Sequence, residues 1–174
     1  MLFKRLTFTP INETISPMED YNNLLGNINN MKMVNDGRIY TPIEVEKIIQ
    51  SQINCIGDYK IFSVFNDINF IGSLNVRLIP NEYIWLGDDF ENSIEIGLII
   101  DNKYWNRGYG KEIVLFAYNY VKSIENKGSK YLIATADPSN IFSIRILENI
   151  FTYKHPDIIQ KFNGKSRLLF YEPI

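Results

Sequence analysis

The stretch Ile94–Lys111, IEIGLIIDNKYWNRGYGK, limits the possible folds more than any other part of the chain. It predicts a β-strand at 94–101, a short turn, and a glycine-rich loop from which a helix begins. Because side chains alternate along a strand, Glu95, Gly97 and Ile99 share one face of it. The glycines let backbone N–H groups approach an anion, and the helix adds unpaired N–H groups and the positive end of its dipole. The segment therefore predicts a strand, loop and helix unit with a pyrophosphate site and a carboxylate on the adjoining strand.

Length and composition fit one domain covering 1–174, with a sizeable core. The net charge is −2 and no run of Lys or Arg stands out, so a nucleic-acid partner is not expected. Met1–Pro10 is not an apolar leader and no window approaches a transmembrane length, so we expect a cytoplasmic protein without a membrane partner. Cys55 is the single cysteine and His155 the single histidine, so neither an intrachain disulfide nor a metal site is expected.

Hydrophobic periodicity and turn residues predict the order β-αα-βββ-α-β-α-ββ, which indicates a mixed α/β (α+β) domain. The predicted strands are 2–8, 60–65, 70–79, 94–101, 131–135, 151–155 and 167–171. The predicted helices are 17–30, 41–55, 108–126 and one that begins near 140, which is expected to bury Ile141, Ile144, Leu147 and Ile150. Thr41 and Glu44 predict a capping box at the start of the second helix, with a proline at its first position.

Two segments of the chain resemble motifs A and B of the Gcn5-related N-acetyltransferase (GNAT) superfamily. The first runs from Glu95 to Ile100 and continues as Trp105–Glu112, WNRGYGKE; the second is ATADPSNIFSIRILENIFTY, which carries Asn140, Ser143 and Leu147. The match is closest to the branch of ribosomal-protein alanine acetyltransferases, which the opening LFKRLTFTPI and the order of elements also resemble. The two motifs together are far more specific than a short G-x-G alone.

The resemblance implies a GNAT fold, with a mixed, mostly antiparallel sheet and helices on both faces. It also implies acetyl-CoA as cosubstrate without a metal, and acetyl transfer to a primary amine by direct attack in a ternary complex. The acceptor could be a protein N-terminus or a small-molecule amine such as a polyamine or an aminoglycoside.

The resemblance further implies a set of cofactor-binding residues. The pantetheine arm would pair with the strand backbone at Leu98, Ile99 and Ile100, and an oxyanion would meet a strand N–H near Leu98. Asn140 would either cap its helix or bond the pantetheine arm. The pyrophosphate would be held by loop amides, contributed by Arg107, Gly108, Tyr109, Gly110 and Lys111.

Two side chains are candidates for the chemistry. Glu95 matches the strand position of a general base, although it could equally be a solvated strand residue. Ser143 could protonate the leaving thiolate, or bond its own helix backbone. Leu147 stands where many members have an acidic tyrosine, so Tyr104 and Tyr109 are further candidates for the acid.

Alternatives remain open from the sequence. The leucine at position 147 favours a non-catalytic acyl-CoA-binding sensor or regulatory module, and a third reading is an unrelated nucleotide-binding domain. Trp85 and Phe90 lie in a polar insertion at 80–93, where they could line an acceptor pocket, form an oligomer contact such as a homodimer interface, or cover the sheet.

Overall fold

The computed structural model describes residues 5–11, 18–53, 60–79, 90, 93–124, 131–162 and 164–174. The strands are β1 (Leu6–Pro10), β2 (Lys60–Asn66), β3 (Asn69–Leu78), β4 (Ile94–Ile100), β5 (Tyr131–Ala136), β6 (Tyr153–Lys154), β7 (Ile159–Lys161) and β8 (Lys165–Pro173). The helices are α1 (Met18–Leu25), α2 (Ile28–Met31), α3 (Pro42–Ile53), the 3-10 turn η3 (Asn102–Tyr104), α4 (Tyr109–Ser123) and α5 (Ile141–Glu148).

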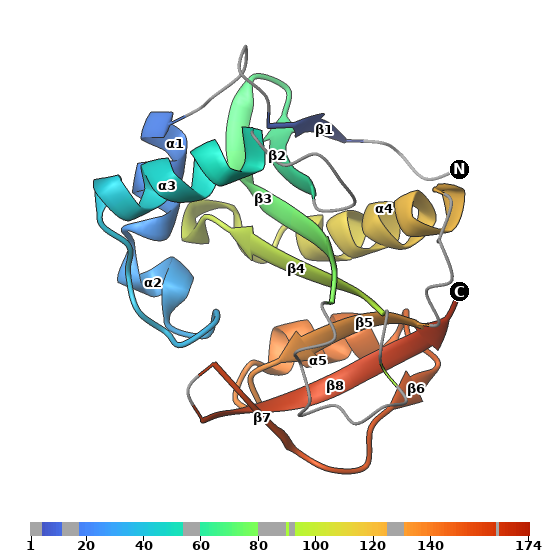
Figure 1. Ribbon diagram of the computed structural model, residues 1–174. Helices are drawn as coiled ribbons and strands as arrows, with labels where there is room; N and C mark the ends of the chain where they lie inside the picture. Colours follow the sequence, from blue (N-terminus) through green and yellow to red (C-terminus); the bar gives the residue numbers. More distant parts are fainter. Residues whose placement is uncertain are drawn as a thin grey trace.

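The strands form one mostly antiparallel sheet, as the resemblance implied. Its order is β1-β2-β3-β4-β5-β8-β6, with β7 paired to β8. The parallel pair is β4 with β5, and its ladder joins Ile94–Ile96 to Leu132–Ala134. Beyond this short ladder the two strands diverge into a V (Figure 1). The sheet therefore opens in its middle, between the carboxyl ends of β4 and β5.

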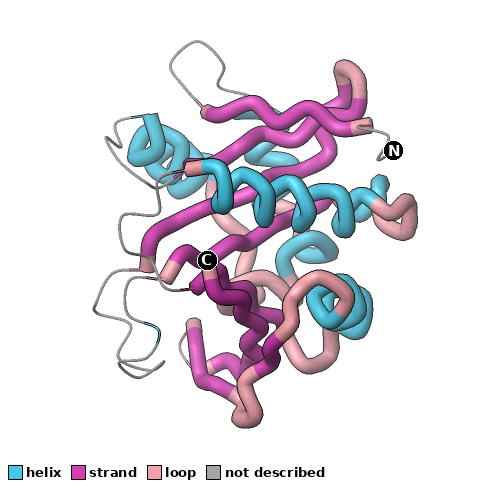
Figure 2. The backbone as a smooth tube through the Cα atoms, turned by 90° about the vertical axis from the view of Figure 1, so that its right-hand side faces the viewer, coloured by secondary structure: helices cyan, strands magenta, loops and turns pink. Residues whose placement is uncertain are grey.

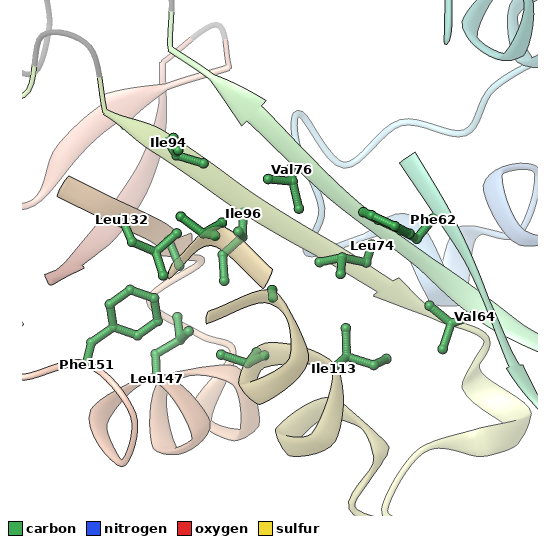
Figure 3. Packing of buried hydrophobic residues seen from close by; sticks show 14 of the residues in the cluster. Phe62, Val64, Leu74, Val76, Ile94, Ile96, Ile113, Leu132, Leu147 and Phe151 are labelled. Atoms are coloured by element: carbon green, nitrogen blue, oxygen red, sulfur yellow. The ribbon is translucent and has the colours of Figure 1, made fainter. Parts of the chain in front are cut away.

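Helices cover both faces of the sheet, as expected. Helix α4 passes behind β3 and β4 in Figure 1, and Figure 2 shows the same layers from the side. Phe62, Leu74 and Ile96 from the sheet pack with Ile113 of α4 and Leu147 of α5 in a buried core (Figure 3). A second core lies on the opposite face, made by residues of α1, α2 and α3 with sheet residues: Tyr21, Leu24, Met31, Val45, Ile49, Ile61 and Ile99. Burial of these apolar side chains on both faces fixes which face of β4 each residue occupies.

Local signals explain the best-predicted helices. The backbone N–H of Thr41 donates to Glu44 Oε2 at 2.8 Å, and the N–H of Glu44 donates to Thr41 Oγ1 at 3.4 Å, so the expected capping box forms before α3. The helical spacing of apolar residues at 113, 114, 117, 121 and 124 predicts one buried stripe. The first four are buried in α4, whereas Ile124 follows the last residue of the helix and is partly buried.

The predicted helix at 17–30 is wrong as a single element. The chain breaks between α1 and α2 at Gly26, where a Cβ would lie 2.6 Å from the carbonyl oxygen of Asn22. Asn27 then caps α2 by accepting a hydrogen bond from the N–H of Asn29 at 2.9 Å. Asparagine favours such caps because its side chain competes for backbone N–H groups.

Three further expectations need correction. The strand expected at 151–155 is β6, which spans Tyr153–Lys154, because Phe151 packs into the core instead. Strand β7 was not expected, and β8 is longer than predicted. Ile141 is 56 % exposed, because the first turn of α5 does not reach the core that Leu147 joins.

Phe90 is buried and its ring packs against Tyr131 and Tyr171, so it covers the sheet. Trp85, Cys55 and the predicted helix end at 127–128 lie outside the described residues. No helix in the described ranges is long and apolar enough to cross a bilayer.

Candidate active site

A cavity of about 220 Å³ lies where β4 and β5 diverge. Its walls come from β3, β4, α4, β5, α5 and β8, and from residues 33–35 after α2. Gly97 and Leu98 line it from β4, and Ser143 lines it from α5. The V between the strands thus leads into a chamber with polar groups on several sides.

Glu95 lies in this wall and is 6 % exposed. Its carboxylate accepts a hydrogen bond from Arg77 Nε at 2.8 Å, and a second cation, Lys161 Nζ, contacts its other oxygen. Arg77 is its cross-strand partner on β3, whereas Lys161 comes from β7. The structure therefore excludes the solvated strand residue that the sequence left open, and places a buried ion cluster there.

Both members of the Glu95–Lys161 pair have altered acidity. Burial raises the pKa of Glu95, but the charges and hydrogen bonds of Lys161 and Arg77 together hold this pKa below its ordinary value. Burial lowers the pKa of Lys161 to about 8, although Glu95 opposes that change. At neutral pH the carboxylate is therefore ionised.

Arg167 of β8 closes another side of the cavity. Its Nη1 donates to Asp137 Oδ2 at 2.8 Å, and its Nη2 donates to the carbonyl oxygen of Asn35. Asp137 also accepts a hydrogen bond from the N–H of Ser139 at 2.9 Å. Burial raises the pKa of Asp137, but these partners hold it below its usual value. The arginine thus ties β8 to the segment that follows α2.

The loop before α4 has the backbone that an anion site needs. Gly108 precedes the helix with φ +82° and offers no side-chain cap to its first N–H groups. The guanidinium of Arg107 lies over the Tyr104 ring, 5.3 Å from its centroid, and donates to the Lys103 carbonyl at 3.0 Å. Arg5 donates to the carbonyl of Arg107 at 3.0 Å and holds the loop from the other side.

This loop and the cavity are separate parts of one site. None of residues 107–111, all of which the structure describes, lines the cavity. Helices α4 and α5 approach closely, since a Cβ on Gly110 would lie 2.9 Å from Ile146 Cδ1. Strand β4 connects the two parts, because it ends at Ile100 just before η3 and the loop.

Helix α5 and its cap contribute three of the sequence-predicted residues to the cavity wall. Asn140 accepts a hydrogen bond from the N–H of Ser143 at 3.1 Å, so it caps the helix, and both residues line the cavity. Leu147 is buried in the core and also forms part of the wall. Tyr109 is buried and its hydroxyl contacts Asn66, and Tyr104 lies under Arg107, away from the cavity. Of the three candidate acids, Ser143 is the one in the wall.

The sequence reading missed four polar residues of this wall and cluster. Arg77 stands inside an otherwise apolar strand pattern and Arg167 directly precedes one, which is a signal for a buried, paired charge. Asn75 has the same signal in a weaker form. Lys161 has none, because its strand was not expected. In the described part of the chain no cluster of His, Cys, Asp and Glu could hold a metal ion.

Comparison with known proteins decides the family. A family model described as an acetyltransferase (GNAT) domain matches residues 5–150, which is most of the chain. The chain belongs to the GNAT family. It is an acetyltransferase whose acetyl donor is acetyl-CoA, and the expected GNAT fold is confirmed. No curated protein matches the sequence.

Solved structures of GNAT enzymes are similar over their whole length. Spermidine N-acetyltransferase from Vibrio cholerae, in complex with CoA and spermine, has 19 % identity and a TM-score of 0.76, with 98 % of this chain and 96 % of that one covered. RimL, a ribosomal L7/L12 α-N-protein acetyltransferase in complex with CoA, has 14 % identity and a TM-score of 0.72, covering 100 % and 97 %. A GNAT acetyltransferase from Bacillus anthracis has 18 % identity and a TM-score of 0.69, covering 97 % and 95 %. At these identities the likeness concerns the fold.

Proposed function

We propose that this GNAT enzyme transfers the acetyl group directly to a primary amine in a ternary complex, and that an α-amino group is the acceptor best suited to it. The observation that carries the proposal is the cavity at the end of the β4–β5 ladder, whose wall holds the buried carboxylate of Glu95 and the hydroxyl-bearing Ser143. No cysteine is among the described residues that line it, so no thiol there is placed to take the acetyl group first.

The chain's own residues fit the donor. Acetyl-CoA supplies the activated acetyl group and leaves as a thiol. The amides of residues 107–111 would hold its pyrophosphate, as the uncapped helix start and the positive φ of Gly108 support. The backbone of Leu98–Ile100 would pair with its pantetheine arm, because the ladder to β5 ends at Ile96. Asn140 would contact the arm while it caps α5.

Proton transfer falls to Glu95 and Ser143. A bond forms between the amine nitrogen and the acetyl carbon while the carbon–sulfur bond breaks. The amine must lose a proton, which Glu95 receives and then releases to water, and Ser143 would donate its hydroxyl proton to the sulfur and recover one from water. A carboxylate can accept about four hydrogen bonds, so Glu95 keeps lone pairs beside its two cationic partners.

The lowered pKa of Glu95 favours one kind of acceptor amine. A carboxyl with a lowered pKa is a weak base, so an acceptor that is already partly neutral has the advantage. Near pH 7.4 about a fifth to a third of a free α-amino group is neutral, against roughly one in a thousand for a lysine-like amine. This difference of roughly two- to three-hundredfold supports the α-amino group of a polypeptide.

The test measures the release of CoA from acetyl-CoA in the presence of each of a panel of amines at pH 7.4. The panel contains a tripeptide with a free N-terminus, the same tripeptide with a blocked N-terminus and a lysine side chain, and spermidine. We expect the free N-terminus to give the highest kcat/KM. A preference for the lysine peptide or spermidine would refute the α-amino acceptor, and no release with any of the three amines would refute all three acceptors.

A further inference from the structure

Asn75 has an unusual place in the cavity wall. It lies on β3 directly opposite Gly97 of β4, on the face that also bears Arg77 and Glu95. Its side-chain oxygen Oδ1 is buried, and no donor in the described part of the chain hydrogen-bonds to it. Asn75 itself lines the cavity, so rotation of its amide about the Cβ–Cγ bond would bring this oxygen to the cavity surface, where an entering molecule can reach it.

A buried carbonyl oxygen without a partner is unfavourable, so such groups in a cavity wall indicate a missing donor. The acetyl donor is the weaker match, because its thioester carbonyl only accepts hydrogen bonds and the N–H groups of its pantetheine arm would be taken by the backbone of Leu98–Ile100. An amine carries N–H groups in both its neutral and its charged form. The chemistry of Oδ1 therefore matches the acceptor amine.

The residue opposite leaves room for that amine. Cross-strand partners point their side chains to the same face, so a Cβ on Gly97 would stand beside Asn75. Such a Cβ would meet nothing within 4 Å. Gly97 is thus not required by a steric clash, and the space beside it is open.

The charges around this space disfavour acceptors that carry several positive charges. The cavity is lined by two arginines, Arg77 and Arg167, and by two carboxylates, Glu95 and Asp137. Each carboxylate is already paired with an arginine, and Lys161 adds a further cation behind Glu95. Among the described lining residues no carboxylate is left over for a second ammonium group.

We propose that Asn75 Oδ1 accepts a hydrogen bond from the acceptor's amino group, that the space beside Gly97 holds the atoms attached to it, and that this subsite selects amines with a single positive charge. The inference rests on the proposed function and names the place where the amine is held. Asn75 is a binding and positioning residue for the acceptor.

The experiment compares Asn75→Leu, which keeps the size and removes the oxygen, with Asn69→Leu at the exposed end of the same strand. Losing one hydrogen bond to the amine should raise KM for the free tripeptide about tenfold. The Kd of acetyl-CoA, measured by calorimetry, should stay within twofold, and Asn69→Leu should change neither quantity. An unchanged KM in Asn75→Leu overturns the proposal, and so does a parallel loss of acetyl-CoA affinity, which would assign the oxygen to the donor.

Asn75→Asp supplies a readout that a structural role would not move. A carboxylate there should hold the charged form of the amine, so the pH profile of kcat should move to higher pH and kcat/KM for spermidine should rise relative to the tripeptide. An unmoved profile together with unchanged selectivity contradicts the proposal.

Gly97→Ala decides the matter if Asn75→Leu does not fold. Its methyl group enters open space, so the melting temperature should hold while KM for the tripeptide rises several-fold; no rise overturns the proposal. If the wild type acetylates the tripeptide and the variants have the same KM, this subsite alone is refuted. Absence of wild-type turnover would refute the proposed function together with it.

Discussion

The two ends of β4 carry two differently built parts of one site. At the carboxyl end, the loop at 107–111 is a continuous segment whose glycine backbone and helix start provide the anion site. At the other end, the Glu95 carboxylate binds cationic side chains from β3 and β7, and Arg167 of β8 separately donates to Asp137 and to the carbonyl oxygen of Asn35. The first part is a local property of the chain, whereas the second exists only in the folded sheet.

This difference predicts how amino-acid substitutions in each part affect the protein. The loop depends on backbone conformation, so the effect of a substitution there should stay local and appear in donor affinity. The cluster consists of buried charges that neutralise one another. Removing one of these side chains leaves the others as buried charges without a counter-charge. Chemistry and stability are therefore linked at Glu95 and separable at Gly108.

Glu95→Gln should have the largest effect. The acetylation rate at neutral pH should fall by roughly 10²–10⁴-fold, because the amide cannot take a proton. The free energy of unfolding should also fall by about 3 kcal/mol, because Lys161 and Arg77 lose their buried counter-charge. Steady-state kinetics and denaturant unfolding measure the two quantities, and raising the pH should partly restore the rate.

The double variant Glu95→Gln with Lys161→Met separates the two roles. It removes one charge of each sign from the cluster, so stability should recover in large part while the rate stays low. Recovery of the rate together with stability would show that Glu95 acts only through the fold. Wild-type rates across pH 6–9 in the single variant would remove it from the mechanism.

Acetyl-CoA should stabilise the folded chain through the loop and the V. At a hundredfold excess over Kd the gain is about 2.7 kcal/mol, which a thermal melt resolves as a shift of several degrees. ATP and NAD at the same concentration serve as controls for an unspecific pyrophosphate effect. An unmoved melting temperature at millimolar acetyl-CoA would contradict donor binding by this chain.

Gly108→Val should weaken acetyl-CoA binding by about tenfold, which is about 1.4 kcal/mol. Its φ of +82° is strained for a branched side chain, so some stability is lost as well. Gly164→Val is the matched control, because φ is +87° there and a Cβ would meet nothing within 4 Å. If both variants lose stability equally but neither loses donor affinity, the loop does not hold the pyrophosphate.

The smallest effect concerns pH. Lys161 has its pKa lowered to about 8 from 10.5, so the unfolded state binds more protons between these values. The cost of charging Lys161 in the fold is present below pH 8 and is relieved as the pH rises toward 10.5. The stability of the wild type relative to Lys161→Met should therefore increase over this range in urea titrations. A constant difference would show that Lys161 titrates normally.

Local patterns made most of the fold predictable. The stripe of α4, the capping box of α3 and the alternation of β4 each depend on neighbours in the sequence, and the structure confirms them. The break at Gly26 was hidden, because apolar residues continue at helical spacing past it. Strand β7 was not predictable because it is three residues long and depends on its pairing with β8.

The site was predictable only in its contiguous part. The motif singled out Glu95, and the strand alternation placed it on the face that it shares with Gly97, but nothing in the sequence paired it with residues 77 and 161. Such contacts depend on strand order and register, which bring distant segments together after the chain has folded. Likewise, no pattern in the sequence pointed to a role for Asn75, because its proposed role depends on Gly97, its partner across the β3–β4 ladder.

The end of the β4–β5 ladder at Ile96 has one more consequence. Two strands that part inside a sheet present backbone edges to each other, and a strand edge elsewhere invites pairing with a foreign chain and aggregation. Here the edge of β4 beyond Ile96 lines the cavity at Gly97, Leu98 and Ile99, so it lies in a recess of the fold. The fold can thus keep an unpaired stretch of strand edge at its centre without presenting it at the surface, where another chain could pair with it.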